Sequence, residues 1–187
     1  MEYRKTVTLK DGRECVIRNG EPQDAEAVLE NFILTHAQTD LLLTYPDEIT
    51  FTVEQEAEYL KQRTESRYEV ELLAEVDGKT AGLASIDRAG RVDKVKHRAE
   101  FGISIDQEYW GLGIGRALTE ACIACAETAG YTQLELGVLA ENQAAAALYK
   151  KAGFIEYGRN PKGFRARSGE YHEIVLMRLE LGKGNQS

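Results

Sequence analysis

A glycine-rich segment, residues 110–118, reads Trp-Gly-Leu-Gly-Ile-Gly-Arg-Ala-Leu and has the composition of an anion-binding turn. Glycines let backbone N–H groups approach a ligand without obstruction by a Cβ atom. A strand pattern precedes this segment and a helical pattern follows it, so its free N–H groups would lie at a helix start, where the helix dipole favours an anion such as a pyrophosphate. Arg116 can add a positive charge. A merely tight turn would also use glycines, so the segment alone does not establish a function.

Two other glycine-rich phosphate-binding motifs do not match this segment. A P-loop requires Gly-Lys followed by Ser or Thr, whereas here Gly115 is followed by Arg116 and Ala117. A dinucleotide fingerprint requires a third glycine where Arg116 or Leu118 stands. The sequence therefore excludes nucleotide-hydrolase and dehydrogenase functions built on these motifs.

The elements that must position this turn follow a mixed α/β pattern. Alternating apolar residues and turn dipeptides predict strands at residues 15–18, 68–76, 81–87, 94–105, 134–139, 154–157 and 171–181. Apolar residues at helical spacing, with their capping residues, predict helices at 24–37, 52–65, 114–128 and 143–152. The second helix begins with a capping box formed by Thr52 and Gln55, and its polar composition predicts that it is exposed. Asp77-Gly78 is a strong hairpin signal, so an antiparallel meander precedes the glycine-rich turn.

The length and composition are those of one ordinary globular domain. At 187 residues, without internal repeats or a Pro/Gly/Ser-rich linker, we expect a single domain over residues 1–181 and a flexible tail over 182–187. No apolar stretch is long enough for a membrane span, and the first residues lack a secretory signal pattern. Three cysteines are too few for a disulfide framework. These features favour a cytoplasmic protein.

A formal net charge of −8 argues against a nucleic-acid surface, because phosphate binding needs clustered Lys and Arg. An acidic surface suits a cationic partner better, although many proteins carry such a charge for solubility. The charge therefore predicts no nucleic-acid partner.

Two motifs resemble those of the GNAT superfamily of N-acetyltransferases. The family pattern Arg/Gln-x-x-Gly-x-Gly/Ala is matched by Gly113 and Gly115, with Trp110 in place of its first residue. Downstream, residues 142–154 read Asn-Gln-Ala-Ala-Ala-Ala-Leu-Tyr-Lys-Lys-Ala-Gly-Phe, which is similar to the family segment Asn-x-x-Ala-x-x-Leu-Tyr-x-x-x-Gly-Phe. The resemblance implies an α/β fold with a mixed, mostly antiparallel central sheet flanked by helices. That sheet is expected to splay between the strands ending at Ile105 and Leu139.

The resemblance also implies a place for acetyl-CoA, the acyl-donor cosubstrate, in the cleft where the sheet splays. Its pantetheine would pair with the backbone near Ile103 and Ile105. Its pyrophosphate would be bound by main-chain amides of Leu112, Gly113, Ile114, Gly115, Arg116 and Ala117.

Amine acetylation needs a neutral amine and a proton for the departing CoA thiolate. Tyr149 matches the family tyrosine that acts as general acid near the CoA sulfur, or it packs with the aromatic and aliphatic residues around it. Glu100 stands where some relatives carry a glutamate base, or it is a solvated strand carboxylate and solvent removes the proton. Asn142 binds cofactor or substrate as in relatives, or it caps the helix that follows it.

Other residues with reactive side chains have simpler explanations. Cys122 and Cys125 have the spacing of a redox or zinc pair, but they lie on the apolar face of a predicted helix without a second pair, which favours core packing. His36, His97 and His172 lack metal-ligand spacing, so we expect structural or surface roles and no metal.

The resemblance predicts an acetyl-CoA-dependent N-acetyltransferase that acts on a primary amine of a small molecule or protein. No residue in the motifs is an obvious acyl acceptor, so the amine is expected to attack directly in a ternary complex. The alternative is a non-catalytic acyl-CoA-binding or sensing domain on the same fold. The identity of the amine is left open, and the family's habit favours a homodimer.

Overall fold

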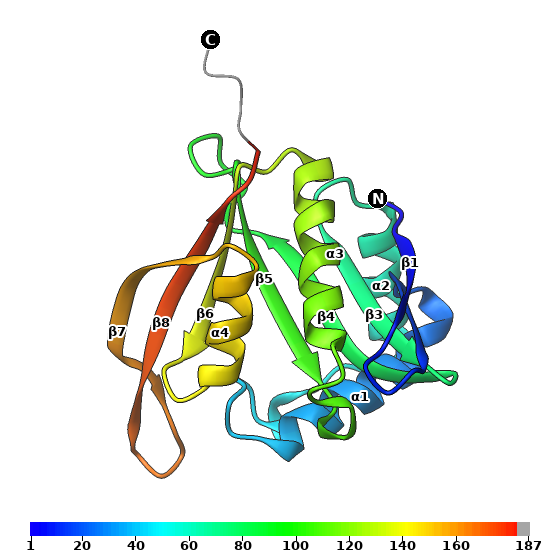
Figure 1. Cartoon of the computed structure of the whole chain (residues 1–187), viewed down its shortest axis with the longest axis horizontal. Coiled ribbons are helices and arrows are strands. Elements are labelled where there is room, and N and C mark those ends of the chain that lie inside the picture. Colours follow the sequence, from blue (N-terminus) through cyan, green and yellow to red (C-terminus); the bar gives the residue numbers. More distant parts are fainter. Residues whose placement is uncertain (183–187) are drawn as a thin grey trace.

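The computed structural model describes residues 1–182, which build one eight-stranded sheet with helices on both faces (Figure 1). The strands are β1 (Arg4–Thr8), β2 (Glu14–Asn19), β3 (Val70–Val76), β4 (Lys79–Arg88), β5 (Arg98–Ile105), β6 (Gln133–Leu139), β7 (Ile155–Arg165) and β8 (Tyr171–Glu180). The helices are α1 (Ala25–Gln38), α2 (Val53–Glu65), α3 (Ile114–Ala129) and α4 (Gln143–Lys151), with short 3-10 turns at Pro22–Asp24, Pro46–Glu48 and Gln107–Tyr109. None of the helices in this range is long and apolar enough to cross a membrane. Residues 183–187 of the predicted tail lie outside the described part of the chain.

The strand order is β1-β2-β3-β4-β5-β6-β8-β7. Adjacent strands are antiparallel except β5 and β6, which run parallel and pair only where Arg98–Glu100 faces Gln133–Glu135. Beyond these three residues the two strands diverge, as Figure 1 shows at the centre of the sheet. The predicted mixed α/β fold, mostly antiparallel and splayed between these strands, is confirmed.

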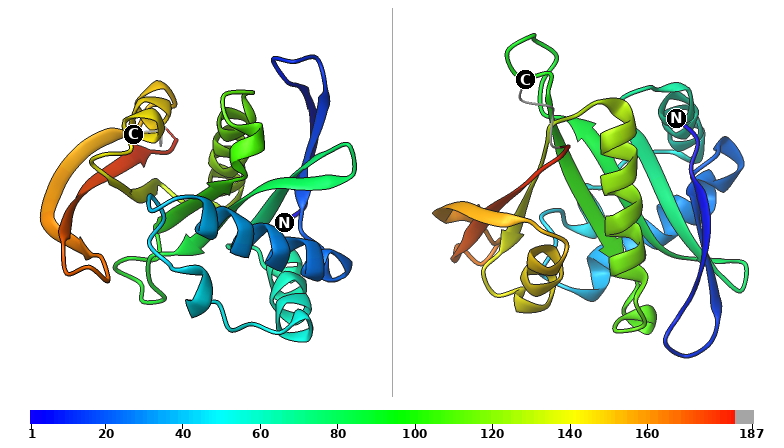
Figure 2. Two further views of the ribbon diagram at one scale, coloured as in Figure 1. Left: turned by 90° about the horizontal axis from the view of Figure 1, so that it is seen from below. Right: turned by 45° about the horizontal axis from the view of Figure 1, so that its top comes forward.

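Helices cover both faces of the sheet, as the left view of Figure 2 shows. α3 and α4 lie on one face, where α3 buries Leu118, Ala121 and Cys122 against the middle strands. α1 and α2 lie on the other face, where a smaller cluster contains Leu60 and Leu73. Alternation of side chains along each strand assigns every second residue to one of these two faces. The same strand can therefore contribute to two different surfaces.

Helix ends follow the predicted capping chemistry. Thr52 accepts a hydrogen bond from the Gln55 N–H (3.3 Å), and the Gln55 side chain accepts one from the Thr52 N–H (2.9 Å), so the predicted capping box is confirmed. α2 is less exposed than its polar composition predicts, because Glu56 and Leu60 are buried against α1 and the sheet. That prediction was wrong for one face of the helix, since composition averages over both faces.

The largest departures from the sequence-based boundaries occur in three strands. The predicted strand 94–105 begins only at Arg98, because turn hydrogen bonds to the Val92 carbonyl bend the chain before it. β1 was not predicted because it is short and its residues are exposed or half-buried. β7 continues to Arg165 rather than ending at residue 157, with irregular pairing around Gly158 and before Phe164. Edge strands bury few apolar side chains, so their hydrophobic pattern is weak.

Candidate active site

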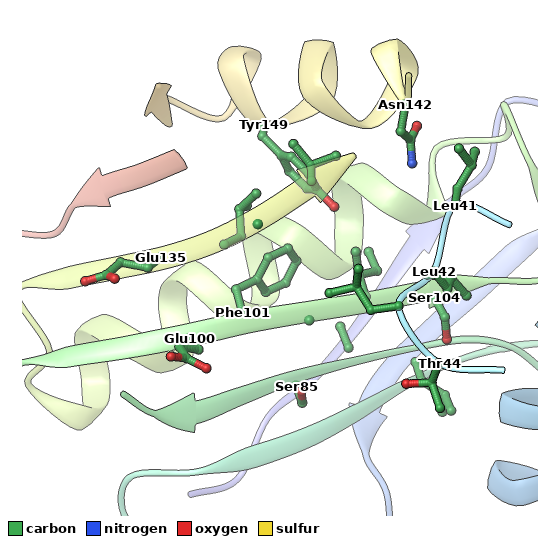
Figure 3. Close-up of a pocket in the computed structure, with 18 of the residues that line it drawn as sticks. Leu41, Leu42, Thr44, Ser85, Glu100, Phe101, Ser104, Glu135, Asn142 and Tyr149 are labelled. Atoms are coloured by element: carbon green, nitrogen blue, oxygen red, sulfur yellow. The ribbon is translucent and has the colours of Figure 1, made fainter. Parts of the chain in front are cut away.

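A cavity of about 520 Å³ opens where β5 and β6 separate, and Figure 3 shows the residues around it. We call it the first cavity. β5 lines it with side chains from both faces of the sheet: Phe101 and Ile103 belong to the α3 face, and Glu100 and Ser104 to the opposite face. β5 can do this because β6 no longer pairs with it beyond Glu100, so no neighbouring strand separates the two faces there. The first cavity therefore connects the two faces of the molecule.

The glycine-rich turn presents free backbone donors at the start of α3. Gly111 and Gly113 have φ values of 79° and 109°, a region that side chains with a Cβ rarely adopt. Gly113 is the N-cap and provides no side-chain cap. The first helical N–H with a protein acceptor is that of Ala117, bonded to the Gly113 carbonyl at 3.1 Å, and the amides of residues 112–116 have no acceptor within the described residues. This arrangement fits an anion such as a pyrophosphate.

Close packing of α3 against β5 depends on Gly115. A Cβ atom at this position would lie 3.2 Å from side-chain atoms of both Ile105 and Leu148. Trp110, which replaces the family's Arg or Gln, also ties the turn to β5, because its indole N–H donates to the Ile105 carbonyl at 2.8 Å. That carbonyl already has a donor, so Ile103 is the freer of the two predicted pantetheine-binding positions.

A lysine that the sequence analysis missed lies beside the turn. The Lys10 Nζ donates to the Gly111 carbonyl at 2.8 Å, and the Lys10 N–H donates to the Leu112 carbonyl at 3.1 Å. Arg116, by contrast, is exposed and pairs with Glu120 at 2.7 Å on the surface of α3. No local pattern around Lys10 indicates this role, because the β1–β2 hairpin brings it to a segment about a hundred residues away.

Tyr149 extends from α4 into the first cavity (Figure 3). Its ring is buried and packs against Phe101 and Phe154, with ring centroids 5.9 Å apart in both pairs. Burial raises the pKa of the Tyr149 hydroxyl to about 12, so it holds its proton at neutral pH. The two roles considered for Tyr149 are compatible, since the ring packs while the hydroxyl end belongs to the cavity.

Three carboxylates stand side by side across β4, β5 and β6. Asp87 is opposite Glu100, and Glu100 is opposite Glu135 in the strand registers. Asp87 pairs with Arg63 and Glu135 with Arg98, both in close contact. Glu100 forms no ion pair or hydrogen bond within the described residues, and it lines the first cavity. It is the one member of this row whose carboxylate is available to a ligand.

Asn142 performs the capping role that the sequence left open. Its Oδ1 accepts a hydrogen bond from the Ala145 N–H at 3.1 Å at the start of α4. Its amide nitrogen points toward the first cavity in Figure 3, so capping leaves a donor there. The cap therefore uses the Oδ1 atom of Asn142 and leaves its amide nitrogen without a role in capping.

His36 also lines the first cavity. Its ring stacks on Phe32 with centroids 3.9 Å apart, and its Nδ1–H donates to the Phe32 carbonyl at 2.7 Å. Burial lowers the pKa of His36, so the ring is neutral at neutral pH.

Cys122 and Cys125 are buried thiols on α3, which confirms core packing. Among residues 1–182 there is no group of three or more His, Cys, Asp or Glu side chains placed to hold a metal.

A second cavity of about 370 Å³ adjoins the first on the α1 and α2 side. The two share lining residues, among them Phe32, Glu71 and Ser85. Glu71 and Glu56 are buried carboxylates in its wall, and neither was identified from the sequence. One signal was available for Glu71, since it is a charged residue within the apolar run Val70 to Leu73 of β3.

Comparisons with known proteins agree with this geometry. The family model of the acetyltransferase (GNAT) family matches residues 34–154. The L-amino acid N-acetyltransferase AaaT of Escherichia coli strain K12 is 30% identical over 167 residues, which cover 88% of this chain and 96% of that relative. The crystal structure of a GNAT family acetyltransferase from Streptococcus pneumoniae has a TM-score of 0.85 and 32% identity, covering 89% of this chain and 99% of that one. The yncA protein of Salmonella typhimurium, solved with acetyl-CoA, has the same fold, with a TM-score of 0.80 at 20% identity and coverage of 91% and 96%.

Proposed function

This chain belongs to the acetyltransferase (GNAT) family, and we propose that its acetyl-CoA-dependent N-acetyltransferase activity resides at the split between β5 and β6. One observation carries this placement. The split exposes β5, which carries the unpaired carboxylate Glu100 on the α1 face and leads directly into the turn with free backbone amides on the α3 face. A transferase that uses two substrates needs such a passage, because donor and acceptor must meet without occupying the same volume.

The residues present fit acetyl-CoA on the α3 face. The amides of residues 112–116 would hold the pyrophosphate, with Lys10 as a nearby positive charge. The β5 backbone at Ile103 has no strand partner on the β6 side, so it would pair with the pantetheine. Asn142, at the start of α4, would donate a hydrogen bond to acetyl-CoA from its amide nitrogen.

Bound acetyl-CoA supplies the acetyl group as a thioester, and the residues of the first cavity handle the protons. Glu100 accepts a proton from the substrate ammonium, directly or through water, so that a neutral amine can form the new C–N bond. As the C–S bond breaks, Tyr149 donates its hydroxyl proton to the departing sulfur. Its high pKa keeps that proton in place until the sulfur develops negative charge. The nitrogen loses its second proton to water as the amide forms, and solvent returns a proton to the Tyr149 oxygen.

Transfer is direct, from thioester to amine, rather than through an acyl-enzyme. Cysteine is the side chain best suited to a covalent route, because its thiolate is intrinsically very nucleophilic. The three cysteines are buried, and none of them lines either cavity. The family's named relatives are transferases, which favours catalysis over a non-catalytic acyl-CoA-binding domain.

Thiol release from acetyl-CoA, followed with a panel of primary amines, tests this function. We expect release that depends on the amine, together with a rise in melting temperature on adding acetyl-CoA. Release at the same rate without any amine would indicate a hydrolase. A thermal shift without release under any condition would indicate the non-catalytic binding domain.

A further inference from the structure

The second cavity has apolar walls and an acidic end. Val28, Phe32 and Leu83 are among its apolar residues, and Glu56 and Glu71 are its two buried carboxylates. Glu56 is only 7% exposed, yet its side chain forms no hydrogen bond or ion pair within the described residues. Glu71 is 9% exposed and lies in the wall that both cavities share. An unpartnered carboxylate facing a cavity is a group for which the protein itself supplies no counter-charge.

The nearest cation is already neutralised. Arg63 pairs with Asp87 and with Glu69 (3.8 Å), and its guanidinium lies 4.5 Å from the centre of the Tyr59 ring. Glu71 forms no ion pair within residues 1–182, because the guanidinium of Arg63 is paired with Asp87 and Glu69. One arginine therefore faces four carboxylates, counting Glu56, Glu69, Glu71 and Asp87. The region is negative overall.

Neither cavity offers a cation to a ligand. Within the described residues, no Lys or Arg lines the first or the second cavity, and the one histidine in their walls, His36, is held neutral by burial. A buried carboxylate without a counter-charge is costly, and a cationic group of a ligand would supply that charge. A ligand carboxylate placed there would find acidic groups and no cation.

The acidic groups occur at two separate places along the joined cavities. Glu100 lines the first cavity alone, Glu56 lines the second alone, and Glu71 lies between them. We propose that the acceptor is a dicationic amine, with the amino group to be acetylated beside Glu100 and a second ammonium group bound by Glu56 and Glu71. This proposal rests on the proposed function, and it adds the substrate class. The apolar residues between the two acidic places suit an aliphatic or aromatic linker.

A dicationic amine differs from the acceptor in the name of the Escherichia coli relative, which is an L-amino acid. An L-amino acid carries a carboxylate next to its amino group, and that carboxylate requires a cationic partner or several hydrogen-bond donors. The first cavity offers its amine a carboxylate, Glu100, but no arginine or lysine for the acid. The charge of the cavity walls therefore favours amines without a free carboxylate.

Three acceptors of equal chain length test the proposal: α,ω-diaminohexane, hexylamine and ω-aminohexanoate, whose far ends are cationic, neutral and anionic. Their kcat/KM values in the thiol-release assay should decrease in that order, with the diamine about 10-fold to 100-fold better than hexylamine. Glu56→Gln and Glu71→Gln should each lower kcat/KM for the diamine about 10-fold and leave hexylamine nearly unchanged. Glu58→Gln removes a charge from the solvent face of α2 and should change neither value.

Calorimetric binding of the diamine, measured without acetyl-CoA, separates this proposal from the proposed function. Diamine binding that weakens in Glu56→Gln, in a protein that acetylates no amine, would overturn the proposed function and support the dicationic site. Turnover of hexylamine or aminohexanoate at a rate equal to the diamine, with wild-type rates in Glu56→Gln, would overturn the dicationic site and leave the transferase standing. Circular dichroism spectra of the variants establish that they are folded.

Discussion

The two faces of the central sheet bind their proposed ligands by different means. On the α3 face the groups available to a ligand are main-chain amides at the start of a helix. On the α1 and α2 face they are side-chain carboxylates from two strands and a helix, Glu100, Glu71 and Glu56. Main-chain recognition constrains the sequence through glycines at fixed spacing, whereas side-chain recognition constrains only which residues converge in space. One face can therefore be common to many acetyltransferases while the other differs between them.

The largest effect should come from breaking the main-chain site. Gly113→Val places a branched side chain at a φ of 109° and beside the free amides, so acetyl-CoA affinity should fall by 100-fold or more, as measured by calorimetry. Gly78→Val is the matched control, because Gly78 also has a positive φ (77°) and open space around its Cβ, but lies in the β3–β4 turn. Similar destabilisation in both variants with affinity lost only in Gly113→Val supports the site. Tight binding by Gly113→Val would exclude the proposed position of the pyrophosphate.

The second-largest effect should come from removing the Tyr149 hydroxyl, which lies in the first cavity between the two faces. Tyr149→Phe keeps the ring that packs on Phe101 but removes the proton donor, so kcat should fall about 100-fold while acetyl-CoA affinity stays unchanged. Tyr131→Phe is the control, because Tyr131 is another buried tyrosine and lines neither cavity. Full turnover by Tyr149→Phe, with thiol release shown to be rate-limiting, would leave Tyr149 with a packing role only.

A smaller effect should appear in the stability of the acidic face. Burial raises the pKa of the Glu71 carboxyl well above its ordinary value, with nearby Asp87 and Glu56 adding to the shift and Arg63 opposing it. Without a bound cation, the folded state therefore holds a proton on Glu71 that the unfolded state releases, so this contribution to stability is complete at acidic pH and is lost as pH rises through the folded-state pKa. Glu71→Gln should remove that loss and raise the free energy of unfolding at pH 8 by about 1 kcal/mol.

Urea unfolding at pH 5 and pH 8 measures this difference. Glu58→Gln serves as the control, since the Glu58 side chain is exposed on α2. If the free energy of unfolding had the same pH dependence in the wild type and in Glu71→Gln, Glu71 would not be the source of the loss of stability at high pH.

The smallest effect should come from the charge beside the main-chain site. Lys10→Met removes an exposed cation that contacts Gly111, and acetyl-CoA affinity should weaken about threefold at low salt and less at high salt. Lys5→Met, also exposed but on β1, should have no effect. An equal loss in the two variants would show that Lys10 acts only through the net charge of the protein.

Much of the structure could be predicted from motifs whose residues lie close together in the sequence. The glycines of the turn, the capping box of Thr52 and Gln55 and the apolar face of α3 were each predicted and are present. The family, the fold and the class of enzyme followed from the resemblance of the turn and of residues 142–154 to the motifs of the GNAT superfamily. The edge strand β1, the extension of β7 and the burial of Glu56 were not predicted, because each depends on a neighbour that the local sequence does not reveal.

The sequence by itself determined the glycine-rich turn, because backbone conformation and helix initiation are local properties of a few consecutive residues. Only the tertiary structure decided what surrounds that turn. It brought Lys10 into contact with Gly111. It placed Glu100, which has no partner within the described residues, between two carboxylates that have arginine partners. It also enclosed Glu56 and Glu71 in a cavity that no Lys or Arg of the described residues lines. Charge complementarity depends on distances between residues far apart in the chain, and those distances exist only once the sheet has formed and split between β5 and β6.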